Sequence, residues 1–285
     1  MQVYLGNTPM DYSGIQLGDT NIQTVVLGDG ITNNQTVLDF IIAAGITNTT
    51  QILALNYLVN SLVENNLWSK FYCIYPLVGG NQNSCKYNLV SPSDYQLNYL
   101  PPASGPTANQ WNFGSGIQLT AFRANDARAQ TNFEPQGVNG WTTNSSIGVY
   151  STTSDASGYD IGVGDGANQS GLIVRYTPNN AFYPGLPLGT NTANADGKGY
   201  YVASRSGSLL HGFKNTTTLI NSASVAYPSP AGYDFNLLND GGPIPSAPSQ
   251  RNLAFVWFGQ YVTKAESDTI YGIVQQYETI LGRQV

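Results

Sequence analysis

The chain has 285 residues, of which 41% are apolar and only 10% charged, with a formal net charge of −6. This length and apolar content suffice for one large domain with an appendage, and they exclude a disordered chain. The eleven Lys and Arg residues do not cluster and no apolar run reaches about 18 residues, so we expect neither a nucleic-acid partner nor a membrane-spanning helix.

Short units at the start of the chain repeat one pattern: an apolar residue, Leu, Gly, a polar residue and a small one. They read YLGNT (4–8), QLGDT (16–20) and VLGDG (26–30), and each predicts a short strand that ends in a turn. Strands this short cannot build a core alone. Residues 1–46 are therefore either a meander packed on the main domain or a docking arm that completes its sheet against another subunit. We predict the arm, docking through Leu5, Gly6, Leu17, Gly18, Leu27 and Gly28.

Two helices are predicted from apolar stripes at helical spacing. The first spans about 50–65, within a connecting segment at 47–69, and its stripe includes Leu55, Leu58 and Leu62. The second closes the chain, starting at a capping box made by Thr263 and Glu266.

Between the helices lie segments rich in Tyr, Phe, Val and Ile, separated by loops of Gly, Asn, Ser and Pro. The predicted strands are 70–78, 85–90, 117–122, 146–151, 172–177, 199–205 and 253–262. Strands without interleaved helices indicate an all-β fold, an antiparallel β-sandwich over residues 70–285. Cys73 and Cys85 flank a turn-like segment, and without a secretory signal we favour two buried free thiols over a disulfide.

The order of several motifs resembles a family of phage virion proteins that carry a concanavalin A-like (laminin-G-like) jelly-roll domain. The motifs are LWSKFYCIYPLVGG, CKYNLVSPSD, GVNGWTTNSSIGVYSTTS, GYYVASRSGSLLHGFKN and the closing NLAFVWFGQYVTKAESDTIYGIVQQYETILGRQV. The resemblance covers roughly residues 50–285. It implies a jelly roll with a C-terminal helix, preceded by an attachment arm, in a virion subunit.

Catalytic patterns are sparse. A retaining glycosidase needs two carboxyl groups about 5–5.5 Å apart, yet of the glutamates only Glu64 and Glu134 precede the C-terminal helix, and neither lies on a predicted strand. His211, the one histidine, follows no nucleophile motif and is expected beside a turn. We therefore predict that the chain is not an enzyme and needs no cofactor.

Two groups of residues are candidates for binding a ligand, one for Ca²⁺ and one for carbohydrate. Asp160 and Asp165, in a glycine-rich loop, are candidate Ca²⁺ ligands, although Asp-Gly also marks an ordinary turn. Aromatic rings in loops match the apolar face of a sugar, which makes four residues carbohydrate-binding candidates: Trp111, Trp141, Tyr159 and Tyr183.

The function predicted from the sequence is a non-enzymatic structural protein of a tailed phage virion, at the head or the tail. Its expected partners are other virion proteins and copies of itself, in a trimer or another symmetric oligomer. The main alternative is an adhesin that recognises glycan on the host surface, and a weaker one is a polysaccharide depolymerase.

Overall fold

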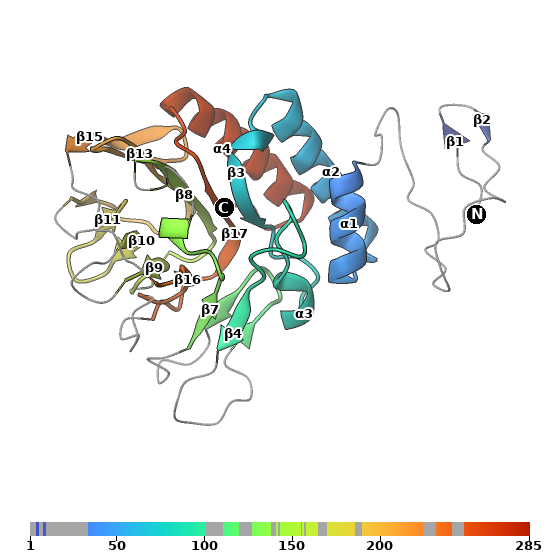
Figure 1. The fold of residues 1–285 in the computed structure, drawn as a ribbon, viewed down its shortest axis with the longest axis horizontal. Helices are drawn as coiled ribbons and strands as arrows, with labels where there is room; N and C mark the ends of the chain where they lie inside the picture. Colours follow the sequence, from blue (N-terminus) through green and yellow to red (C-terminus); the bar gives the residue numbers. More distant parts are fainter. Residues whose placement is uncertain are drawn as a thin grey trace.

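The computed structural model consists of two facing β-sheets with helices on the outer face of one of them (Figure 1). It describes residues 34–100, 111–119, 127–137, 141, 143–154, 156, 158–164, 170–185, 190–224, 232–240 and 248–285, together with the backbone of residues 4, 5, 8 and 9. The prediction of an all-β antiparallel sandwich is confirmed.

The larger sheet has seven antiparallel strands in the order β12-β11-β10-β9-β16-β7-β4. Their bounds are β4 (Asn98–Leu100), β7 (Arg128–Gln130), β9 (Ile161–Val163), β10 (Ser170–Tyr176), β11 (Ala181–Tyr183), β12 (Thr192–Ala193) and β16 (Asn236–Leu237).

The second sheet has six antiparallel strands in the order β15-β14-β13-β8-β17-β3. Their bounds are β3 (Phe71–Tyr75), β8 (Asn144–Ser151), β13 (Gly199–Ser206), β14 (Leu209–Lys214), β15 (Thr217–Ser224) and β17 (Leu253–Gly259). Two short pairs complete the described strands: β1 (Tyr4–Leu5) with β2 (Thr8–Pro9), and β5 (Trp111–Asn112) with β6 (Gln118–Leu119).

The two sheets enclose one core because alternate residues of each strand face inward. Val149 on β8 and Phe258 on β17 meet Ile161 on β9 and Val174 on β10 in this layer, all with 2% exposure or less. Phe133 contributes from the loop after β7, with its ring centroid 5.6 Å from that of Phe258.

Helices cover the other face of the six-stranded sheet and make a second core. The covering helices are α1 (Gln35–Ala44), α2 (Thr49–Glu64) and α4 (Lys264–Ile280). The other helical segments are the short α3 (Gln82–Cys85) and the 3₁₀ turns η1 (Trp68–Lys70) and η2 (Pro135–Gly137). Trp257 on β17 packs beneath the covering helices, donating from Nε1 to the Tyr200 hydroxyl at 2.9 Å. Gly148, opposite it on β8, is required because a Cβ there would collide with the indole.

Most of the long predicted elements are present. The helix expected at 50–65 is α2, and the closing helix starts at the expected capping box, with Gly282 following in the left-handed region. The strand predicted at 85–90 is wrong: α3 ends at Cys85, and the following segment runs irregularly along β3.

Residues 1–46 are not a uniform arm. The first repeat unit forms the β1–β2 pair, whereas residues 35–44 form α1, whose Val37, Phe40 and Ile41 are buried in the second core. Gly6, Leu17, Gly18, Leu27 and Gly28 lie outside the described residues, so docking through the repeats stays a prediction.

Cys73 and Cys85 are both buried, and both are free thiols. Burial raises the pKa of the Cys85 thiol to about 11, so it stays protonated at neutral pH. In the described part of the chain, no helix is both long and apolar enough to cross a bilayer.

Candidate functional site

An open groove lies where the helices stop short of the outer strands of the six-stranded sheet. Phe213 on β14 belongs to the core beneath the helices, and His211, two residues earlier, faces the same side. The start of α4 closes the groove on one side. We call this the His211 groove; its volume is about 530 Å³, and it is lined by His211, Phe213, Thr218, Asn221, Tyr261 and Lys264. That volume is in the range of about 300–1,000 Å³ typical of ligand sites.

Aromatic rings gather in the His211 groove. The imidazole of His211 stacks on Phe213, with centroids 6.1 Å apart and planes at 19°, and lies 6.2 Å from the ring of Tyr261. Phe213 is buried, whereas His211 and Tyr261 are half-buried and offer surface to a ligand. Such rings match the apolar faces of sugars and other cyclic ligands.

The polar groups around these rings bring little net charge. Thr218 and Asn221 are exposed on β15, and Lys264 Nζ lies 2.6 Å from Oδ1 of Asp268, which offsets its charge. Partial burial lowers the pKa of His211 below its usual 6.5, so the imidazole is neutral at pH 7. A neutral imidazole has one hydrogen-bond donor and one acceptor. The groove thus fits an uncharged polar ligand with an apolar face.

Tyr261 is held in place from both sides of its backbone. Its N–H donates to Asn144 Oδ1 at 2.7 Å, and its carbonyl accepts from Lys70 Nζ at 3.1 Å. Lys70 in turn pairs with Glu266, the capping-box residue, at 2.7 Å. The backbone that carries the ring is therefore held in place before any ligand arrives, which reduces the entropy cost of binding.

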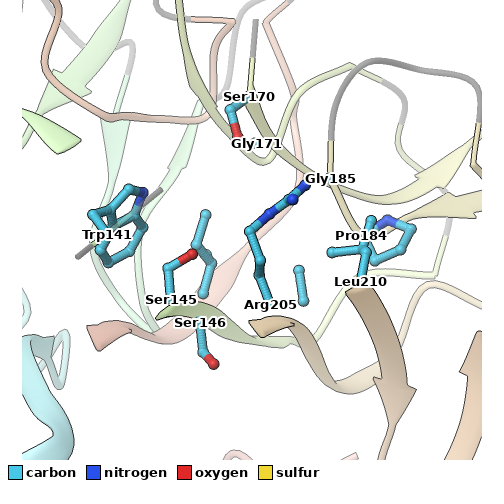
Figure 2. Close-up of a pocket in the computed structure, with 11 residues that line it drawn as sticks. Trp141, Ser145, Ser146, Ser170, Gly171, Pro184, Gly185, Arg205 and Leu210 are labelled. Carbon is cyan, nitrogen blue, oxygen red and sulfur yellow. The ribbon is translucent and has the colours of Figure 1, made fainter. Parts of the chain in front are cut away.

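A second pocket lies between the two main sheets, where β8 and β10 begin. Figure 2 shows the Arg205 side chain rising between Trp141 and Pro184, with Ser145 below and Ser170 above. Its volume is about 20 Å³. Because one water needs about 10–15 Å³ on this measure, the pocket has room for one or two water molecules and not for a sugar ring.

A third, shallower groove of about 320 Å³ lies beside α3 and β4. It is lined mainly by amide side chains, those of Gln82, Asn83, Gln96, Asn98 and Asn132, with Lys86, Leu97 and Tyr99. Tyr99 is 8% exposed, so this groove offers polar groups without an open aromatic face. The His211 groove is therefore the better candidate site for a ligand that has both polar groups and an apolar face.

The aromatic residues selected from the sequence are mostly not available to a sugar. Trp141 is 1% exposed and packs against Phe133 with centroids 5.1 Å apart, and Tyr159 and Tyr183 are each 7% exposed. Trp111 is half-buried against Tyr99 and Phe113. Trp111 lies on β5 and Tyr183 on β11, not in the loops in which we expected them, and burial of large rings is favourable.

Asp160 already has partners for both carboxylate oxygens. Oδ1 accepts from Arg251 Nε at 2.9 Å and from Ser249 Oγ at 2.6 Å, and Oδ2 accepts from the Val174 N–H at 2.7 Å. Asp160 is fully buried, so it is a structural anion and not an open calcium ligand. Asp165 lies outside the described residues, and among those described no three His, Cys, Asp or Glu side chains form a metal-binding group.

His211 was expected beside a turn, and it lies within β14 opposite Ser204. The packing of His211 beside Tyr261 was not predicted from the sequence. The H-x-F spacing of residues 211 and 213 was the available signal, since on a strand it puts both rings on one face.

Comparisons with known proteins give only distant likenesses. No family model matches the chain, and no curated protein matches it. A Trypanosoma rangeli sialidase mutant with trans-sialidase activity shares 13% identity at a TM-score of 0.41, over 79% of this chain and 39% of that one. Domain 4 of a GH43 extracellular arabinanase from Geobacillus stearothermophilus, in complex with arabinotriose, shares 10% identity at a TM-score of 0.40, over 71% of this chain and 98% of that one.

These neighbours correct one prediction. The sialidase is an enzyme and the arabinanase domain comes from one, which contradicts the prediction that this chain is not an enzyme, and we withdraw that prediction. The chain spans about two fifths of the sialidase's length. At such TM-scores the likenesses support no statement about a ligand or reaction of this chain.

Proposed function

We propose that the protein is a glycan-binding module whose ligand lies in the His211 groove. One observation carries the proposal: the rings of His211 and Phe213 on β14 and of Tyr261, in the loop before α4, converge on a groove whose charged lining residue, Lys264, is ion-paired with Asp268. A pyranose has an apolar face for the rings and hydroxyls for Thr218, Asn221 and the neutral imidazole.

The test is binding of the full chain to an array of bacterial surface polysaccharides, followed by titration calorimetry on the oligosaccharides retained. Tyr261→Ala is expected to weaken binding about tenfold, or about 1.4 kcal/mol, because it removes one ring face. Tyr176→Ala is the matched control, since Tyr176 is 38% exposed and is not among the residues that line the groove.

Equal losses in the two variants, or no glycan retained, would contradict the proposal. Release of reducing sugar is measured on the same oligosaccharides, so that cleavage is distinguished from binding.

We further propose that the module is displayed on a phage virion. The support is the sequence resemblance over roughly residues 50–285 and the low charge of the chain. An antibody to the full chain is expected to label purified particles, and a chain that sediments apart from all particles would argue against display.

A further inference from the structure

A lysine amine and an asparagine carboxamide meet between the two main sheets. Asn194 directly follows β12 of the seven-stranded sheet, and Lys214 is the last residue of β14 in the six-stranded sheet. Lys214 Nζ lies 3.1 Å from Asn194 Oδ1. The carbon that an amine would attack, Asn194 Cγ, is the atom bonded to that oxygen. A nucleophile and an electrophile are therefore neighbours in the folded protein, which removes most of the entropy cost of a reaction between them.

The Asn194 side chain is fixed in one orientation. It is buried, and its Nδ2 donates to the Val174 carbonyl at 2.7 Å and to the Tyr201 hydroxyl at 3.0 Å. Its backbone N–H donates to the Asn180 carbonyl at 2.7 Å. Because both hydrogens of the amide nitrogen have acceptors, the amide oxygen is the atom turned toward the lysine.

Lys214 is half-buried beside this carboxamide. Its Nζ also donates to the Asp196 carbonyl at 2.7 Å and lies 5.2 Å from the centre of the Tyr201 ring. Partial burial lowers the pKa of Lys214, although the charge of Asp196 opposes the shift. A lower pKa increases the fraction of neutral amine, which is the form that acts as a nucleophile.

The Tyr201 hydroxyl is placed to transfer a proton. It lies 3.0 Å from Nδ2 and 3.4 Å from Oδ1 of Asn194, so it reaches both polar atoms of the carboxamide. Tyr201 is fully buried, and burial raises the pKa of its hydroxyl, which therefore stays protonated at neutral pH. A protonated hydroxyl beside a departing nitrogen can act as its general acid.

We propose that Lys214 and Asn194 form an intramolecular amide bond, without the help of another enzyme. The neutral Nζ adds to Cγ of Asn194, the Cγ–Nδ2 bond breaks, and ammonia leaves. The proton that Nζ loses passes to the departing nitrogen through the Tyr201 hydroxyl, which is regenerated. Nothing is oxidised or reduced, and no co-reactant is consumed. The product joins the end of β12 in one sheet to the end of β14 in the other by a covalent bond.

Mass spectrometry of the purified full chain tests for this bond. The wild type is expected to be lighter than its sequence mass by one ammonia, in a fraction that grows as the sample is incubated. After denaturation and digestion with trypsin, residues 176–198 are expected to be joined to residues 206–251, because trypsin does not cut at an acylated lysine. Fragmentation of the joined peptide locates the bond at Lys214 and Asn194.

Three variants test the assignment. Lys214→Arg keeps the positive charge but cannot form the bond, so the joined peptide is expected to disappear. Lys198→Arg is the matched control, since Lys198 is exposed in the segment between β12 and β13, and it is expected to close like the wild type. Tyr201→Phe keeps the ring without the hydroxyl and is expected to slow bond formation about a hundredfold. Thermal unfolding verifies that the variants fold.

A wild-type chain whose mass stays constant at the full sequence value would overturn the proposal. An equal loss of ammonia in Lys214→Arg would also overturn it, because the loss would then come from cyclisation at another asparagine. A Tyr201→Phe variant that closes as fast as the wild type would contradict the role given to the hydroxyl. The proposal does not depend on the glycan ligand, so it is tested without any sugar.

Discussion

Asp160 and Arg251 form an ion pair, fully buried, that connects distant parts of the chain. Besides Asp160, Arg251 donates to the carbonyls of Thr153 at 2.7 Å and Ala156 at 2.9 Å. Each charge is thus satisfied only in the complete fold. The pair ties the end of β8 and the start of β9 to the segment that enters β17.

Asp160→Asn is expected to lower the free energy of unfolding by about 3–5 kcal/mol, because it leaves the Arg251 guanidinium buried without its counter-charge. Urea unfolding at pH 7 measures the loss. Asp268→Asn is the control; its carboxylate is 37% exposed and pairs with Lys264, so the expected loss is below about 1 kcal/mol. A similar loss in both variants would show that the buried pair has no special role.

Glu278 makes the stability of the folded protein depend on pH. Burial raises the pKa of its carboxyl from 4.5 to about 7, although Arg283 at 2.7 Å opposes the shift. A raised pKa means that the folded protein holds the proton more tightly than the unfolded chain does. The resulting stabilisation is complete below pH 4.5 and is lost as the pH rises through 7.

We therefore expect the free energy of unfolding of the wild type to fall between about pH 5 and pH 8 relative to that of Glu278→Gln, which cannot titrate. Unfolding curves at intervals across this range give the difference. Parallel pH profiles for the two proteins would contradict a raised pKa.

At the scale of elements, α4 depends on its first turn. The Thr263 hydroxyl oxygen accepts a hydrogen bond from the Glu266 N–H at 3.2 Å. In the reverse direction, the Glu266 carboxylate accepts one from the Thr263 N–H at 2.8 Å. Thr263→Ala is expected to cost about 1 kcal/mol of stability. Thr269→Ala, the same change at a half-buried mid-helix position, is expected to be neutral or slightly stabilising, because Ala is the better helix former. Thermal unfolding compares the two, and a reversed order would show that the cap contributes little.

Elements with local signals were predictable from the sequence, and those defined by their neighbours were not. The capping box and apolar stripe of α4 lie within one segment, and β17 is a long apolar run. By contrast, β15 is rich in Thr, Ser and Asn, and it is a strand because it pairs with β14, which in turn pairs with β13. The His211 groove was missed for the same reason, since Tyr261 reaches His211 only through the assembled sheet and α4.

On the scale of the whole molecule, the folded unit extends further toward the N-terminus than the repeats suggested. Removing residues 1–33 is expected to leave the unfolding transition unchanged, because α1 and both cores remain. Removing residues 1–46 also deletes α1 and is expected to cost several kcal/mol, since each buried side chain such as Phe40 contributes about 1.5–3 kcal/mol. Calorimetry distinguishes the two, and equal transition temperatures would show that α1 is dispensable.

The central position of β17 has a consequence for how the protein is made. β17 lies between β8 and β3, yet it is the last of the three in the chain, at Leu253–Gly259. During synthesis, β3 and β8 therefore each keep an unpaired apolar edge until β17 has left the ribosome. Such intermediates are prone to aggregate. We expect the six-stranded sheet to close only after β17 has been synthesised, and soluble yield to improve when a holdase chaperone is supplied.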